Sequence, residues 1–241
     1  MIDKHATRLR DLQIFYTQLD LLEEKIGGKR LLTEPGLSQL LPNRGVYFFF
    51  EPGECRSGSG QGMRVVRVGT HAVSQGSRTT LWNRLRNHRG FLNGSMPGGG
   101  NHRGSIFRLH VGTALINRDR WPVEAAAHWG KNASAPREIR EKEYPLEKAV
   151  SETIRAMPFL FIEVGDPASA SSLRGAIERN SIALLSRCRE IDPPSQRWLG
   201  HWADREAIRR SGLWNVKYIG EDYDPAFLEL LKGLVAAQPC L

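Results

Sequence analysis

The sequence GVYFFF at residues 45–50 and RVVRV at residues 64–68 determine how we interpret this chain. Both runs are rich in β-branched and aromatic residues, which is typical of strands, and the Gly/Ser-rich residues between them predict a hairpin loop. After Gly69 and a polar loop, residues 81–88 (LWNRLRNH) predict a basic helix. The hairpin thus carries a phenol, Tyr47, and the helix carries Arg84 and His88 one turn apart, a combination that suits chemistry on a phosphate.

Regular elements are also predicted on both sides of this stretch. Apolar residues at helical spacing predict a helix over residues 6–26, which Gly27-Gly28 ends. An apolar run predicts a third strand at residues 159–164. Three further helices are expected: a short piece around 37–41, a helix from an N-cap at Ser171 or Ser172 to about Arg189, and a last one near 226–237.

The middle of the chain is less regular. Glycines cluster between residues 94 and 104 and predict a loop. The alternating sequence SIFRLHV at 105–111 predicts a strand. Residues 114–157 are predicted to be helical in pieces, broken by Pro122, Pro136 and Pro145. We interpret these pieces as an insertion.

These elements together predict an α/β protein of the α+β type, with a small, mainly antiparallel mixed sheet flanked by helices. We expect a helical N-terminal arm at residues 1–43 and a core at 44–190 that contains the insertion at about 114–157. A C-terminal extension at 191–241 is expected to pack on that core.

Composition favours a basic protein with a polyanionic partner. The 241 residues have a formal net charge of +8, and the sequence pI is about 9.7. Nucleic acid is the first candidate partner and an anionic membrane surface the second, although charge alone fits a merely basic soluble protein equally well. No apolar run approaches a membrane span, and no signal peptide is recognisable. With three scattered cysteines, we expect a cytoplasmic protein that has reduced thiols and no membrane partner.

Two short motifs carry a resemblance to a known family. Gly45-Val46-Tyr47 resembles the first signature of the GIY-YIG nucleases, and Arg67-Val68-Gly69 stands where their second signature belongs. Arg84 matches the arginine of that family. His88 matches a histidine that some restriction-enzyme members carry.

The resemblance continues in the second half of the chain. Glu178 matches the glutamate that binds metal in this family, and Asn180 matches an asparagine often found near it. The match covers roughly residues 45–89 and 159–189, and the long insertion resembles the restriction-endonuclease branch. Arg67 departs from the pattern because the family has a tyrosine there. A literal Tyr218-Ile219-Gly220 lies too far downstream to be the hairpin partner, so we treat it as coincidence.

The resemblance implies a role for each matching residue. Tyr47 is the candidate general base, and a phenol needs nearby cations to ionise at neutral pH. Arg67 could supply one such cation or contact phosphate. Arg84 would clamp phosphate, whereas His88 could orient water, share a proton with Tyr47 or bind phosphate. The alternatives are an ordinary strand tyrosine and a solvated basic helix face.

Glu178 would hold one Mg²⁺ or Mn²⁺ as a Lewis acid, or else be an exposed helix glutamate. Asn180 could bind a water near the metal or cap a loop, and Gly69 supports the site. We expect nucleic-acid contacts from three arginines: Arg86, Arg89 and Arg103.

The resemblance therefore implies a metal-dependent DNA endonuclease, a hydrolase of restriction type or a related defence nuclease. Its partner would be double-stranded DNA, and a homodimer would provide two active sites for two strands. A catalytically inactive DNA-binding module with the same fold is the main alternative, motivated by Arg67. A basic helical adaptor for proteins or anionic membranes is the third.

Overall fold

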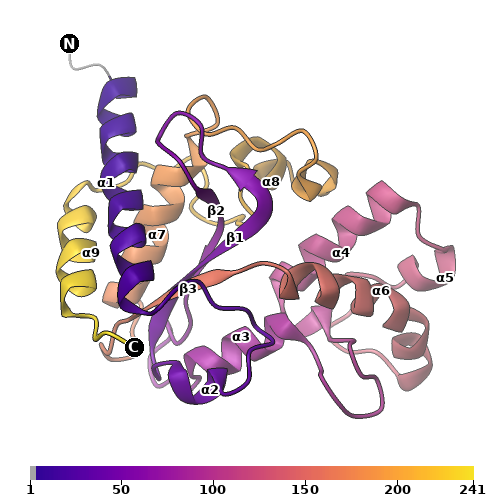
Figure 1. Cartoon of the computed structure of the whole chain (residues 1–241). Coiled ribbons are helices and arrows are strands. Elements are labelled where there is room, and N and C mark those ends of the chain that lie inside the picture. Colours follow the sequence, from indigo (N-terminus) through magenta and orange to yellow (C-terminus); the bar gives the residue numbers. More distant parts are fainter. Residues whose placement is uncertain (1–3) are drawn as a thin grey trace.

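The computed structural model describes residues 4–241 and has a three-stranded sheet at its centre (Figure 1). The strands are β1 (Gly45–Cys55), β2 (Met63–Gly69) and β3 (Phe159–Glu163), in the order β2-β1-β3. Both pairs are antiparallel. The predicted fold class, a small antiparallel sheet flanked by helices, is confirmed.

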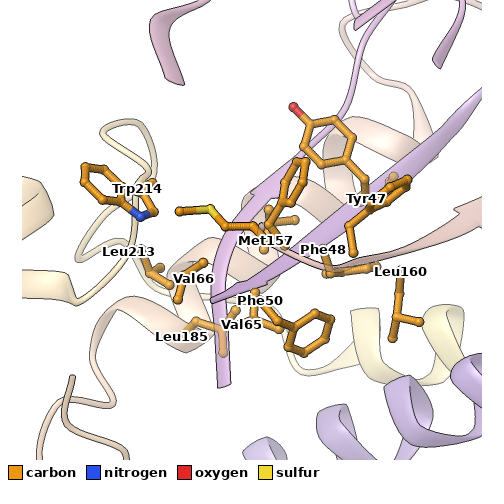
Figure 2. Close-up of a cluster of buried hydrophobic side chains, with 14 of the residues drawn as sticks. Tyr47, Phe48, Phe50, Val65, Val66, Met157, Leu160, Leu185, Leu213 and Trp214 are labelled. Carbon is orange, nitrogen blue, oxygen red and sulfur yellow. The ribbon is translucent and has the colours of Figure 1, made fainter. Parts of the chain in front are cut away.

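The register of the sheet decides which side chains share a face. Tyr47 lies opposite Gly69 on β2 and Phe161 on β3, and Phe49 lies opposite Arg67. Because side chains alternate along a strand, these residues share one face of the sheet. Figure 2 shows the rings of Tyr47 and Phe50 on opposite sides of β1.

Three helices cover the face that carries Phe48: α1 (Lys4–Lys25), α7 (Leu173–Ser186) and α9 (Ala226–Ala237). They lie together on one side of the sheet in Figure 1. Phe15 of α1 packs edge-on against Phe48, with ring centroids 5.9 Å apart, and both side chains are fully buried. This apolar layer fixes the orientation of β1 and so fixes the direction in which Tyr47 points.

The opposite face receives a second group of helices, α3 (Leu81–Arg89), α4 (Ile106–Asp119), α5 (Val123–Ala126) and α6 (Arg137–Arg155), together with the 3₁₀ turn η1 (His102–Gly104). Phe107 of α4 packs against Phe49, with ring centroids 5.6 Å apart, and anchors this group to the sheet. Residues 114–157 lie in this helical layer.

Two predictions in this region are wrong. Residues 106–111 begin helix α4, not a strand, because Phe107, Val111 and Ala114 form a buried helical stripe. The apparent alternation misled because Arg108 and His110, read as exposed, are buried as well. Pro145 does not break α6: it lies on the exposed face, where the carbonyl that it leaves without a partner can bond water.

The remaining elements are α2 (Leu37–Leu40), the 3₁₀ turn η2 (Leu199–Trp202) and α8 (Glu206–Ser211). The segment after α8 covers the outer edge of β2. The amide of Trp214 donates to the carbonyl of Val66 at 2.7 Å, and the side chain of Asn215 bonds both the amide and the carbonyl of Val68. The edge strand is therefore not left open to another chain.

A membrane-crossing helix is absent from the described part of the chain, since none of its helices is both long and apolar enough.

Candidate active site

Tyr47 and His88 form a buried hydrogen-bonded pair at the centre of the site. The hydroxyl of Tyr47 lies 2.9 Å from Nε2 of His88, and neither side chain has accessible surface. Nδ1 of the same imidazole lies 2.7 Å from the hydroxyl of Ser105, the N-cap residue of α4. Strand β1, helix α3 and the start of α4 thus meet in one chain of hydrogen bonds.

Gly69 makes room for the phenol. A methyl group at this position would lie 2.2 Å from the hydroxyl oxygen of Tyr47 and 2.3 Å from its Cζ. No such approach is tolerated between real atoms, so only glycine allows the ring of Tyr47 to cross the end of β2. Gly69, at the end of the second motif, therefore leaves the space that Tyr47 of the first motif occupies.

The hydrogen-bond chain links the tautomer of His88 to the state of Tyr47. Ser105 is 1% exposed, and its oxygen accepts the amide of Arg108. A neutral imidazole has one acceptor nitrogen, so the buried hydroxyls of Tyr47 and Ser105 cannot both donate to His88. Only with Tyr47 as a phenolate is each of these groups satisfied, because Ser105 then donates to Nδ1 and Nε2 donates to the phenolate oxygen.

His88 is neutral at ordinary pH. Burial is the main reason that its pKa lies well below the usual 6.5, and repulsion from Arg84, Arg67 and Arg108 lowers that pKa further. A proton added to His88 would be a buried cation next to other cations. His88 is therefore suited to donate a hydrogen bond and not to store a second proton.

Arg67 is a buried cation on the same face as Tyr47. One guanidinium nitrogen donates to the carbonyl of Trp214 at 2.7 Å, and the group lies over the ring of Phe107 at 4.6 Å. Burial lowers the pKa of Arg67, and the interactions with Tyr47 and Glu178 oppose that shift. A guanidinium stays ionised in proteins, so this position supplies a permanent positive charge beside the phenol.

Arg84 is the unengaged cation of the site. Its helix begins at the N-cap Thr80, whose side chain accepts the amide of Asn83. The guanidinium is half-buried, and within residues 4–241 it has neither a hydrogen-bond acceptor nor a carboxylate partner. Arg84 lines a hollow of about 300 Å³ together with Gly104 and Ser105. An anion could bind here without displacing an existing partner.

Glu178 approaches from helix α7. Its Oε1 accepts the amide of Thr70 at 3.3 Å, while Oε2 has no hydrogen-bond partner in the described part of the chain. Burial raises the pKa of this carboxyl, and the charges of Arg67, Arg84 and Lys217 counteract the rise. Glu178 also lines a hollow of about 620 Å³.

Glu178 is the candidate ligand of this site for a divalent cation. Within the described residues no group of three or more His, Cys, Asp or Glu side chains comes together as a metal site. Mg²⁺ needs only one or two carboxylates when water and substrate phosphate complete its shell. The free oxygen of Glu178 fits that requirement, so the donor set suits an ion that arrives with the phosphate.

The structure does not bring every predicted residue to this cluster. Asn180 donates to the carbonyl of Ala176 and accepts the amide of Asp224, so it holds the chain just before α9. Arg103 forms a two-pronged ion pair with Glu143, both contacts at 2.7 Å, and its side chain is 6% exposed.

The other two arginines predicted to contact nucleic acid lie on α3. Arg86 is exposed, whereas Arg89 is half-buried and lies over the ring of Trp82 at 4.7 Å.

Three contributors were missed from the sequence: Ser105, Thr70 and Trp214. Ser105 had a detectable signal, because a serine preceding an apolar helical stripe is a typical N-cap. Thr70 and Trp214 act through their backbone amide and carbonyl, which no residue type reveals.

Comparison with known proteins identifies the family of the chain. A family model described as GIY-YIG domain matches residues 6–240. No curated protein and no solved structure matches the chain. GIY-YIG domains are typically endonucleases, which implies DNA as the substrate. Since the match spans nearly the whole sequence, from α1 to the end of α9, the chain belongs to the GIY-YIG domain family.

Proposed function

We propose that this protein is a metal-dependent endonuclease that hydrolyses phosphodiester bonds in double-stranded DNA, as a restriction enzyme or a related defence nuclease. One observation carries the proposal: the buried Tyr47–His88 pair lies next to the charges of Arg67, Arg84 and Glu178. A structural tyrosine in a strand needs no such surroundings. Hydrolysis of a phosphodiester needs a base, cations for the phosphoryl oxygens and a carboxylate for metal.

Tyr47 would act as the base that activates water. Arg67 interacts electrostatically with Tyr47, and both Arg67 and Arg84 disfavour positive charge on His88. The imidazole therefore stabilises the phenolate through its Nε2 hydrogen. The phenolate takes a proton from water, the hydroxide oxygen bonds to phosphorus, and the bond from phosphorus to the leaving oxygen breaks.

Arg84 would bind the phosphate undergoing attack. Its guanidinium has no internal partner, and a guanidinium can bond two phosphate oxygens at once. Arg67 has a different role, because it is held by Trp214 and Phe107 and does not reach into the hollow that Arg84 lines. The site thus separates a cation for the base from a cation for the substrate.

Glu178 would hold Mg²⁺ or Mn²⁺ through its free oxygen. When bound, the ion supplies Lewis-acid stabilisation of the leaving oxygen. In the absence of phosphate, the three cations around Glu178 disfavour a second positive group there. We therefore expect the ion and DNA to bind cooperatively. One site per chain implies that cutting both strands needs a homodimer or two sequential nicks.

A cleavage assay tests the proposal. Supercoiled plasmid and phage DNA, methylated and unmethylated, are incubated with Mg²⁺, Mn²⁺ or EDTA. We expect cutting that needs the metal and is abolished in Glu178→Gln, which keeps the shape of the side chain. Glu190→Gln, at an exposed glutamate after α7, is the matched control and should cut normally. Metal-dependent cutting that survives in Glu178→Gln would refute the assigned role.

The inactive DNA-binding module is the second candidate, and one observation favours it. Tyr47 has no accessible surface, so in this conformation water cannot reach its hydroxyl. Catalysis therefore requires the side chains that cover Tyr47 to move. Salt-sensitive DNA binding without cutting on any substrate or metal would establish this second candidate.

A further inference from the structure

Phe91, just beyond helix α3, is an aromatic residue held rigidly at the surface. Its amide donates to Gly99 and its carbonyl accepts both the amide of Gly98 and the guanidinium of Arg155. Its side chain is nevertheless 49% exposed. An ordered backbone that presents a large apolar ring to water is typical of a binding surface.

Phe91 lines two hollows, which together we call the Phe91 groove. A hollow of about 500 Å³ extends from Gly104, beside the hollow of Arg84, past Asn87 and Asn101 to Phe91. A second hollow, of about 510 Å³, continues from Phe91 to Arg140 and Tyr144 of α6. Figure 1 shows the loop between α3 and α4 extending away from the sheet beside this helical layer.

The charge of the groove is positive and largely uncompensated. Arg86 and Arg140 line it, are exposed, and have no ion-pair partner among residues 4–241. Exposed Lys148 lies against Gly98 in the same loop. Glu141 lines the second hollow and is paired with Arg137 at 2.7 Å. Glu143 and Glu147, which line a smaller hollow shared by Phe91 and Arg140, are paired with Arg103 and Arg108.

We propose that the Phe91 groove binds the DNA duplex beyond the scissile phosphate, with Phe91 packed against a base step. Cations along both walls match the phosphate backbones, and the asparagine amides offer donors and acceptors to base edges. An apolar side chain between them is the device by which proteins wedge or stack on bases. This inference rests on the proposed function, because it places the substrate of the same site.

Binding is measured without cleavage, by fluorescence anisotropy of a labelled duplex in EDTA, with Glu178→Gln as the parent. Phe91→Ser should weaken binding about tenfold with an unchanged salt slope, since it removes an apolar contact and no charge. Arg140→Ala should lower the salt slope by about one. Leu21→Ser on α1, 43% exposed, and Arg197→Ala, an exposed cation outside the groove, are the matched controls.

The outcomes separate this inference from the proposed function. Binding by Phe91→Ser and Arg140→Ala that equals the parent's overturns the groove, even if the native chain cuts DNA. Weakened binding in both variants supports the groove, even if no metal produces cutting. Equal weakening in Leu21→Ser and Arg197→Ala would show a non-specific effect and would also overturn it. A parent that binds no duplex, either in EDTA or in Mg²⁺, overturns both.

Discussion

The substitution Gly69→Ala tests the geometry of the site most directly. Alanine would place its Cβ 2.2 Å from the hydroxyl of Tyr47, 2.3 Å from Cζ and 2.7 Å from Cε2. These contacts lie far inside van der Waals distance, so the ring must move. Because Tyr47 is fully buried between the sheet and α3, it cannot move without losing its 2.9 Å hydrogen bond to His88.

Two effects set the size of the stability loss in Gly69→Ala. Overpacking a buried position costs about 1–3 kcal/mol. Breaking the buried hydrogen bond between Tyr47 and His88 costs about 1–3 kcal/mol more. We therefore expect Gly69→Ala to lower the free energy of unfolding by about 2–6 kcal/mol, a large share of the roughly 5–15 kcal/mol of an ordinary domain. A displacement of about 1 Å at the base should also reduce cleavage by about 100-fold.

Urea unfolding, followed by tryptophan fluorescence and circular dichroism, measures the stability change. Gly165→Ala is the matched control, because nothing lies within 4 Å of a Cβ at that position. The double variant Tyr47→Ala/Gly69→Ala should be less destabilised than the sum of its single variants, since removing the ring removes the clash. Additive effects in this cycle, or a Gly69→Ala chain as stable as the native one, would refute the reasoning.

Two further predictions concern buried hydrogen bonds. Ser105→Ala should destabilise by about 1 kcal/mol as a lost N-cap and should change the tautomer balance of His88, which ¹⁵N NMR of the imidazole can follow; a native chain with the proton on Nδ1 at every pH would contradict the role of Tyr47 as a phenolate. Glu51 accepts hydrogen bonds from the indoles of Trp198 and Trp214 at 3.1 Å each, and burial raises its pKa above the usual 4.5. Its neutral form stabilises the fold at low pH, and that contribution is lost as pH rises through the raised pKa. Glu51→Gln should therefore gain stability relative to the native chain with rising pH; a difference that stays constant across unfolding curves at several pH values would contradict this.

The sequence correctly predicted the elements whose hydrophobic periodicity is unambiguous. The apolar hairpin strands, the strand at 159–163 and the last helix appear as expected, because their buried faces follow a strict period. The error at residues 106–111 has a physical source. Arg108 is fully buried and satisfied by Glu147, Ser151 and the carbonyl of His88, a tertiary arrangement that a local pattern cannot contain.

The candidate site was predictable in part. The four-residue spacing of Arg84 and His88 places both on one helix face, and the register of β1 and β2 follows from the hairpin. What the sequence could not give is the identity of partners across elements. Asn180 resembles a site residue by position. Its side-chain amide is nevertheless hydrogen-bonded to the backbone of α7 and of the segment before α9.

Arg67 shows how a departure from a family motif can be supported by residues outside the motif. Its guanidinium lies on the ring of Phe107 from α4 and bonds the carbonyl of Trp214 from the C-terminal segment. Neither contact would exist if residues 106–111 were a strand or if residues 213–215 did not cover β2. A buried cation without a carboxylate in contact is costly, and here the nearby Tyr47 and Glu178 offset part of that cost. Arg67 thus brings a positive charge to a position where a tyrosine could offer only a hydroxyl, so this departure does not by itself argue for loss of activity.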